Sequence, residues 1–164
     1  MTNVTNVVIA GLGGQGVLKA SDILADAAFR AGLDVKKSEL HGMSQRGGSV
    51  SSDVRFGPRV LSPMVPPGEA NVLLVLEGTQ VEINRPTLRA DGILIGPDVL
   101  ADGALKNKKS LNVALLGAMS IVLDIPEEDW LAAMYANLAE KLHTINEQAF
   151  ALGRAAALER NQAG

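Results

Sequence analysis

The chain has 164 residues, 47% hydrophobic and 20% charged, and a formal net charge of −3, which fits one globular domain over residues 1–164 without an electrostatic footprint for nucleic acid. It contains no cysteine, which excludes disulfide bonds and any zinc or iron–sulfur site built from its own thiolates. The longest apolar stretch, residues 113–123, is about half of the ~20 residues that a bilayer span requires. Residues 1–6 lack the basic and apolar regions of a secretory signal, so we expect no membrane association and a cytoplasmic protein.

The first elements in chain order predict a strand, a glycine turn and a helix. Residues 4–10 are β-rich and end at the glycine cluster of residues 11–16. The apolar positions of residues 17–31 recur at helical spacing, and Gly32 is placed to end that helix. Residues 34–40 suit a second strand, parallel to the first because a helix connects the two. This order is typical of the start of a doubly wound α/β domain.

The middle of the chain predicts further strands. Residues 49–56 alternate apolar and polar side chains, and Gly57-Pro58 is expected to turn that strand back into an antiparallel hairpin with residues 59–61. Residues 71–76 are apolar on both faces, as in a central strand. The remaining predicted elements of this region are a helix over residues 77–90, broken at Pro86, and a buried strand over residues 92–95.

The last third of the chain predicts helices, over residues 112–123, 126–141 and 144–159, with Pro126 at the first position of its helix. Lys106, Lys108 and Lys109 precede them as a short basic cluster, which we interpret as a solvated loop. The expected fold is therefore α/β: three-layer α/β/α, with a Rossmann-like, mixed, mostly parallel sheet and a helical C-terminal region.

The glycine cluster is the first candidate site. Gly11, Gly13 and Gly16 have the G-x-G-x-x-G spacing between a strand and a helix, where glycines let backbone approach a ligand and the helix N-terminus attracts a phosphate. The alternative interpretation is a tight turn that only lets strand and helix pack. An NAD site is a further alternative, because Glu39 follows the turn at about the distance of a ribose-binding acid.

The second candidate site is the polar loop of residues 39–50. Its Ser44, Gln45 and Arg46 concentrate hydrogen-bond donors that could hold a carboxylate, a phosphate or the backbone of a partner. A hydrogen-bonded connection between two strands explains the composition equally well. No catalytic residue and no metal ligand is predicted, since the chain lacks a Gly-x-Ser-x-Gly nucleophile elbow and His41 has no evident nucleophile beside it.

These two motifs carry a family resemblance. The string of residues 11–16, followed by the His-Gly-Met-Ser-Gln-Arg-Gly-Gly-Ser-Val string of residues 41–50 and by Asn112-Val113 opening a helix, resembles the γ-type subunit or domain of 2-oxoacid:ferredoxin oxidoreductases. Within this pyruvate/ketoisovalerate oxidoreductase γ domain family, the chain is most similar to the small (β) subunit of indolepyruvate ferredoxin oxidoreductases. The resemblance runs from Val4 to about Gly153, and residues 92–112 form a shorter stretch than is usual in the family.

The resemblance implies a complex that depends on thiamine diphosphate, decarboxylates a 2-oxo acid oxidatively, forms an acyl-coenzyme A and passes electrons to ferredoxin or a similar acceptor. It implies that this chain is inactive alone and holds no cofactor itself. Thiamine diphosphate, Mg and the iron–sulfur clusters then belong to one or more larger partner subunits, and this chain contributes coenzyme A binding and subunit contacts. An aryl 2-oxo acid such as indolepyruvate is the implied substrate.

The predicted cofactor-binding residues come from the two motifs and the start of the later helix: Gly11, Gly13, Gly14, Gln15, Gly16, Ser44, Gln45, Arg46, Gly47, Gly48 and Asn112. For Asn112 the alternative is a helix cap without a ligand. The competing functional class is a stand-alone, Rossmann-like nucleotide-binding module with a regulatory or scaffolding role and no chemistry of its own.

Overall fold

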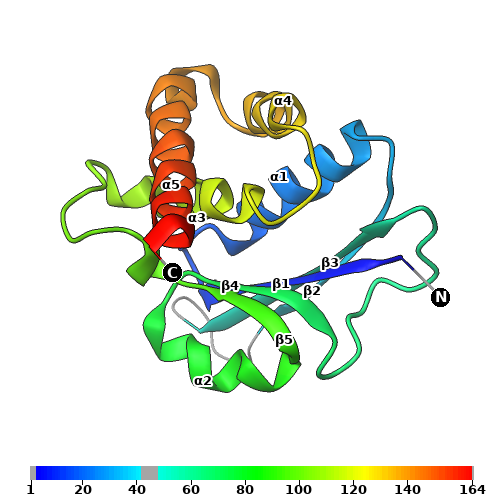
Figure 1. Ribbon diagram of the computed structural model, residues 1–164. Helices are drawn as coiled ribbons and strands as arrows, with labels where there is room; N and C mark the ends of the chain where they lie inside the picture. The colour runs from blue at the N-terminus through cyan, green and yellow to red at the C-terminus, as the bar shows by residue number, and fades with distance from the viewer. Residues whose placement is uncertain (1–2, 42–47, 164) are drawn as a thin grey trace.

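The computed structural model describes residues 3–41 and 48–163, and a five-stranded sheet lies at the centre of this part of the chain (Figure 1). Its strands are β1 (Thr5–Leu12), β2 (Asp34–His41), β3 (Ser49–Gly57), β4 (Ala70–Val75) and β5 (Leu88–Ile95), in the order β2-β3-β1-β4-β5. β3 is antiparallel to both of its neighbours, whereas β4 is parallel to β1 and β5 is parallel to β4. All strands except β3 therefore run in one direction.

The long helices lie on one face of the sheet (Figure 1). They are α1 (Val17–Arg30), α3 (Leu111–Ser120), α4 (Glu127–Asn137) and α5 (His143–Ala163). The other face carries the short helix α2 (Val81–Asn84) between two 3₁₀ turns. The expected α/β class, mixed sheet and helical C-terminal region are confirmed, although the layer on the second face is thin.

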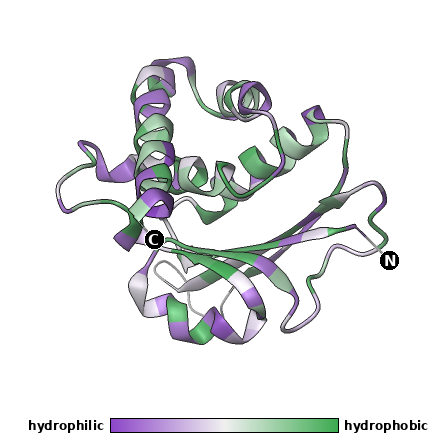
Figure 2. Cartoon of the chain, in the orientation of Figure 1, coloured by the Kyte–Doolittle hydropathy of each residue, from purple (hydrophilic) through white to green (hydrophobic). Residues whose placement is uncertain are grey.

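The main core lies between the sheet and the long helices. Val7 and Ile9 of β1 meet Leu24 of α1 there, all fully buried, because alternate residues of a strand point to the same face. Trp130 of α4 is also fully buried, with its ring 6.1 Å from that of Phe150 in α5. The central strands are predominantly hydrophobic, whereas α5 mixes hydrophobic and hydrophilic residues, as expected for a helix with one buried side (Figure 2).

The predicted hairpin after Gly57 is wrong. Residues 58–62 form no strand, and β3 instead pairs with β2 and β1. The segment is held as a loop by hydrogen bonds: the Val60 backbone N–H donates to Asp34 Oδ2 over 2.8 Å, and Arg55 Nη1 donates to the Ser62 carbonyl over 2.8 Å. Pro58 has no N–H to give to a ladder, which makes a strand at this point unfavourable.

The region after β4 also differs from the expectation. Helical turns cover residues 78–87 only, and β5 begins at Leu88 rather than at residue 92. β5 is not the buried strand that its apolar end suggests, since Ile95 is its one buried residue. The reason is its place at the sheet edge, where it has β4 as a neighbour on one side and none among the described strands on the other.

The helical predictions are correct in type and shift at their ends. Pro126 precedes α4 as its N-cap residue rather than standing at the first helical position, and α5 extends to Ala163. β2 does run parallel to β1, but β3 lies between the two. Among the described residues, no helix is long and apolar enough to cross a membrane.

Candidate functional site

The glycine loop joins β1 to α1 at the carboxyl end of the sheet. Gly14 and Gly16 have positive φ angles of 89° and 86°, a conformation that favours glycine. No side chain caps α1, and its first turn holds no acidic residue. The first backbone N–H groups of a helix have no partner within the helix. The start of α1 is therefore suited electrostatically to an anion.

The glycines of this loop have different structural roles. A Cβ on Gly11 would lie 2.9 Å from Gln15 Oε1 and 3.2 Å from the Cβ of Leu76, so this glycine is required by packing. The Gly13 N–H donates to the Gly48 carbonyl over 2.8 Å. Gly14 is exposed, and a Cβ there would have no atom within 4 Å. Gly14 is thus the position where the loop backbone faces open space.

Gln15 ties the loop to two parts of the sheet. Its Oε1 accepts a hydrogen bond of 2.7 Å from the Leu12 N–H, and its Nε2 donates to Glu77 Oε2 over 3.0 Å. Glu77 stands two residues after the end of β4, and sequence reasoning missed it. Its position after an apolar strand could have indicated it. Neighbouring parallel strands end at the same edge of a sheet, so a residue after β4 lies near the glycine loop after β1. Gln15 therefore holds the loop in shape, with both ends of its amide already bonded.

Replacing Gln15 by alanine should lower the free energy of unfolding by about 1–2 kcal/mol, because two partly buried hydrogen bonds of about 1 kcal/mol each are lost. Glu77→Ala removes one of them and should cost about 1 kcal/mol. Glu77→Gln is the matched control, since its amide oxygen still accepts from Gln15. Urea unfolding of the three variants measures this, and equal stability of Glu77→Ala and Glu77→Gln would show that the contact contributes nothing.

Asn112 reaches the glycine loop from α3. It is 7% exposed, and its Nδ2 donates to the Gly16 carbonyl over 3.3 Å. A Cβ on Gly16 would lie 2.5 Å from the same nitrogen, so the residue must be glycine for this approach. The N-termini of α1 and α3 therefore meet at the loop, and Asn112 packs against the motif from which it is 96 positions distant in sequence.

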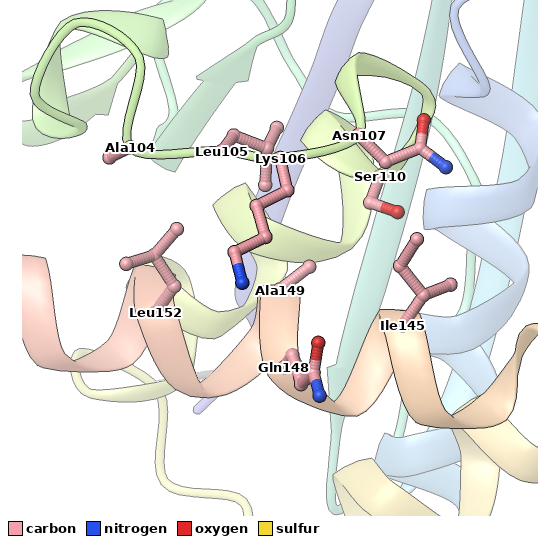
Figure 3. Close-up of a pocket in the computed structure, with 9 residues that line it drawn as sticks. All are labelled: Ala104, Leu105, Lys106, Asn107, Ser110, Ile145, Gln148, Ala149 and Leu152. Atoms are coloured by element: carbon pink, nitrogen blue, oxygen red, sulfur yellow. The ribbon is translucent and has the colours of Figure 1, made fainter.

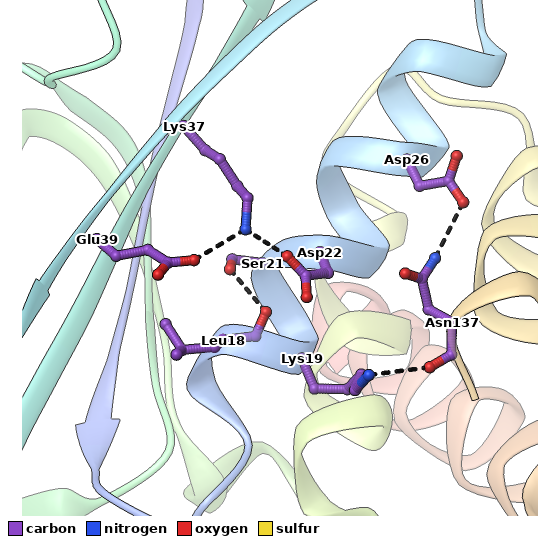
Figure 4. Close-up of polar contacts among 8 residues, drawn as sticks. All are labelled: Leu18, Lys19, Ser21, Asp22, Asp26, Lys37, Glu39 and Asn137. Atoms are coloured by element: carbon purple, nitrogen blue, oxygen red, sulfur yellow. Dashed lines mark hydrogen bonds and ion pairs between the residues drawn. The ribbon is translucent and has the colours of Figure 1, made fainter. Parts of the chain in front are cut away.

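A pocket of about 290 Å³ opens beside the loop. It is lined by Gly13, Gly14 and Gly16, by the first turn of α1 including Lys19, and by Val50 of β3. Lys19 Nζ donates to the carbonyl of Asn137, the last residue of α4, over 3.1 Å (Figure 4). The pocket thus combines exposed glycine backbone, a helix N-terminus and a cation.

The place of the loop in the sheet also favours binding. β1 leads into α1 on one face, whereas β4 leads into α2 on the other face (Figure 1). Strands β1 and β4 are adjacent and parallel, so the chain leaves them in opposite directions. A place where neighbouring strands connect to opposite faces is called a topological switch point. It leaves a crevice at the carboxyl ends of the strands, where ligands of open α/β sheets commonly bind.

The second motif is placed at this same end of the sheet. Leu12 pairs with Ser49 and His41 pairs with Val50, so the residues that flank the motif adjoin the glycine loop. Gly48 contacts it directly through the bond from Gly13. The predicted site residues that come together in the structure are Gly11, Gly13, Gly14, Gln15, Gly16, Gly48 and Asn112. The other four, Ser44, Gln45, Arg46 and Gly47, lie outside the described residues.

Glu39, the acid considered for an NAD ribose, is bonded elsewhere. Lys37 Nζ donates to Glu39 over 2.9 Å and also to Asp22 of α1 (Figure 4). Burial lowers the pKa of Lys37, but its hydrogen bonds to Asp22 and Glu39 outweigh that effect and raise the pKa overall. Glu39 thus belongs to an ion-pair group between β2 and α1. Among the residues described, no group of three His, Asp or Glu side chains is arranged to hold a metal ion.

The similarity of this chain to known proteins identifies its family. The family described as pyruvate ferredoxin/flavodoxin oxidoreductase matches residues 6–102. Among curated relatives, indolepyruvate oxidoreductase subunit IorB of Thermococcus kodakarensis is 39% identical over 137 residues, which is 84% of this chain. The alignment spans 66% of the length of that relative.

Two solved structures share the fold. The γ subunit of a keto/oxoacid ferredoxin oxidoreductase from Geobacter sulfurreducens superposes with a TM-score of 0.79 at 24% identity, over 94% of this chain and 99% of the other. A 2-oxoglutarate:ferredoxin oxidoreductase from Magnetococcus marinus, with 2-oxoglutarate, coenzyme A and succinyl-CoA bound, superposes with a TM-score of 0.81 at 22% identity. That match covers 97% of this chain and 32% of the other, so the fold here corresponds to one part of a longer chain.

Proposed function

Because the chain belongs to the pyruvate ferredoxin/flavodoxin oxidoreductase family, we propose that it is the small, cluster-free subunit of a 2-oxoacid:ferredoxin oxidoreductase. The assembled enzyme would decarboxylate a 2-oxo acid oxidatively, transfer the acyl group to coenzyme A and pass the electrons to ferredoxin or a similar acceptor. The absence of cysteine supports a division of labour, since this chain has no thiolate to ligate a cluster. Thiamine diphosphate, Mg and the clusters would then be carried by larger partner subunits.

The contribution of this chain would be a contact with coenzyme A. The observation that carries it is the pocket at the glycine loop, where Gly14 leaves backbone exposed and the uncapped start of α1 lies beside Lys19. Backbone N–H groups at a helix N-terminus and a nearby cation are the groups that bind phosphates. The Magnetococcus marinus enzyme, one part of which shares this fold, has coenzyme A bound, which supports the choice of ligand.

The substrate class follows from the relatives. The name of the Thermococcus kodakarensis relative is that of an indolepyruvate oxidoreductase subunit, and an aryl 2-oxo acid is therefore the first candidate. The Magnetococcus marinus structure contains 2-oxoglutarate, which makes an acidic 2-oxo acid the second. The glycine-loop pocket cannot discriminate between them if it binds coenzyme A, because the acyl group is then selected on the partner subunit.

Co-expression of this chain with its genomic neighbour tests the proposal. We expect a complex that reduces a viologen dye with a 2-oxo acid only when coenzyme A is present, measured over a panel of aryl, branched-chain and acidic 2-oxo acids. Each chain alone should be inactive. Absence of activity with every substrate, together with a single monodisperse chain that binds NAD or ATP, would instead establish a stand-alone nucleotide-binding module.

A further inference from the structure

A second pocket, remote in sequence from the glycine loop, lies between residues 104–110 and α5 (Figure 3). Its volume is about 250 Å³. Leu105, Ile145 and Leu152 supply apolar walls, and Lys106, Ser110 and Gln148 bring polar groups to the lining. The size suits a single ring or a short branched chain rather than a dinucleotide, because sites for drug-sized ligands occupy about 300–1,000 Å³.

Ser110 is a largely buried residue whose hydroxyl opens into this pocket. The residue is 3% exposed, and its hydroxyl makes no hydrogen bond to any residue of the described chain. It stands immediately before α3 but does not cap that helix. Its backbone N–H is bonded to the Asn107 carbonyl, which fixes the residue in place. The Ser110 hydroxyl is not one of the buried side-chain atoms that lack a partner, so its oxygen reaches the pocket, where a ligand atom can replace water as its hydrogen-bond partner.

The charges around the pocket are unbalanced in the positive direction. Lys106 lines the pocket, and Lys108 and Lys109 follow it just before α3, whose first turn holds no acidic residue. None of the three lysines forms an ion pair within the described residues. Cations at the positive end of a helix dipole are unfavourable unless an anion is present.

The acidic residues nearby do not offset these lysines. Glu147, next to Gln148 on α5, does not line the pocket and instead accepts a hydrogen bond from the Tyr135 hydroxyl, which raises the pKa of Tyr135. Asp98 pairs with Arg160 over 3.2 Å. Asp102 is exposed and does not line the pocket. The pocket therefore presents apolar walls, the Ser110 hydroxyl and a net positive rim.

We propose that this pocket binds a small apolar monocarboxylate. The apolar body packs against Leu105, Ile145 and Leu152, Lys106 holds the carboxylate, and the Ser110 hydroxyl bonds a polar atom of the ligand. The apolar walls disfavour inorganic phosphate, which has no apolar surface to bury. The concave shape favours a small molecule over a flat partner surface. This site is independent of the proposed coenzyme A contact, and its test does not require the partner subunit.

The test is a titration of the purified full chain with benzoate, followed by amide chemical shifts in NMR spectra. Benzamide is the neutral ligand of the same shape, and inorganic phosphate is the anion without an apolar body. We expect benzoate to shift the amides of residues 104–110 and 145–152, and benzamide to bind roughly tenfold more weakly because a charge-assisted bond is lost. Phosphate should leave these residues unshifted.

Three variants, one of them a control, locate the interaction. Lys106→Met removes the charge from an exposed side chain and should weaken benzoate binding roughly fivefold to tenfold. Lys141→Met, at an exposed lysine outside the pocket, is the matched control and should bind benzoate as the parent chain does. Ser110→Ala should weaken binding severalfold without removing a charge.

Several outcomes would overturn the proposal. Equal affinity for benzoate and benzamide would exclude a carboxylate site, and equal weakening in Lys106→Met and Lys141→Met would exclude a role for Lys106. Shifts confined to the glycine loop would assign the anion to the other pocket. If no small ligand shifts residues 104–110 but a co-expressed partner chain does, the pocket is a protein contact instead.

Discussion

Gly153→Ala is expected to lower the free energy of unfolding by about 3 kcal/mol, the largest loss of stability among the substitutions considered. A Cβ at this position would lie 1.7 Å from the Ala114 carbonyl oxygen of α3. On the facing helix, a Cβ on Gly117 would lie 2.1 Å from the Phe150 carbonyl oxygen. The two helices therefore touch backbone to backbone, and an added methyl group must push them apart. Urea unfolding followed by the fluorescence of the buried Trp130 measures the effect.

The sign of the change in unfolding free energy distinguishes close helix packing from helix propensity. Helix propensity alone predicts that alanine within α5 stabilises the chain by about 1 kcal/mol relative to glycine. Gly78→Ala is the control, because a Cβ there has no atom within 4 Å and its φ angle is not positive. We expect that control to change stability by less than about 0.5 kcal/mol. A Gly153→Ala chain as stable as the parent would mean that α3 and α5 do not pack at this distance.

The second large effect is expected from Gly14→Asp, measured on the coenzyme A affinity of the co-expressed complex. Gly14 has a φ angle of 89° and faces open space in the glycine-loop pocket. A carboxylate there would repel the phosphates that we place at the start of α1. Like charges brought together cost about 2 kcal/mol at a partly exposed site, which corresponds to a roughly thirtyfold weaker affinity.

Gly14→Asn is the matched control for this experiment. Asparagine has the shape of aspartate and tolerates a positive φ angle comparably, so the two variants differ chiefly in charge. We expect Gly14→Asn to bind coenzyme A much more tightly than Gly14→Asp, and the difference to shrink at high salt. The KM for the 2-oxo acid should stay unchanged in both. Equal affinities of the two variants would place the phosphates away from Gly14.

The sequence predicted the parts of the fold that depend on local patterns. The strand, glycine turn and helix of residues 5–30 follow from hydrophobic periodicity and from the backbone freedom of glycine, and the three later helices follow from apolar spacing. The expected hairpin and the expected burial of the strand over residues 92–95 were wrong, because both depend on pairing partners. An apolar run such as residues 93–95 is compatible with a central strand or an edge strand, and only the order of the sheet distinguishes them.

The candidate site was predicted in its residue types but not in its assembly. The G-x-G-x-x-G spacing identified the glycine loop, and Gly14 and Gly16 have the backbone conformation that only glycine adopts readily. The spacing did not reveal that Gln15 bonds Glu77, nor that Asn112 packs on Gly16. Such contacts join residues distant in the chain, and no periodic pattern records them.

By itself, the sequence determined that this is an α/β chain without thiol ligands, with two glycine-rich motifs of a recognisable family. These properties are carried by residue types and by short-range spacing, which act through local backbone preferences. The tertiary structure alone decided that β3 lies between β1 and β2, that α3 meets α5 at two glycines, and that an unbalanced lysine cluster borders an apolar pocket. Those features arise from the mutual packing of distant segments, because burial, close approach and charge balance exist only once the chain is folded.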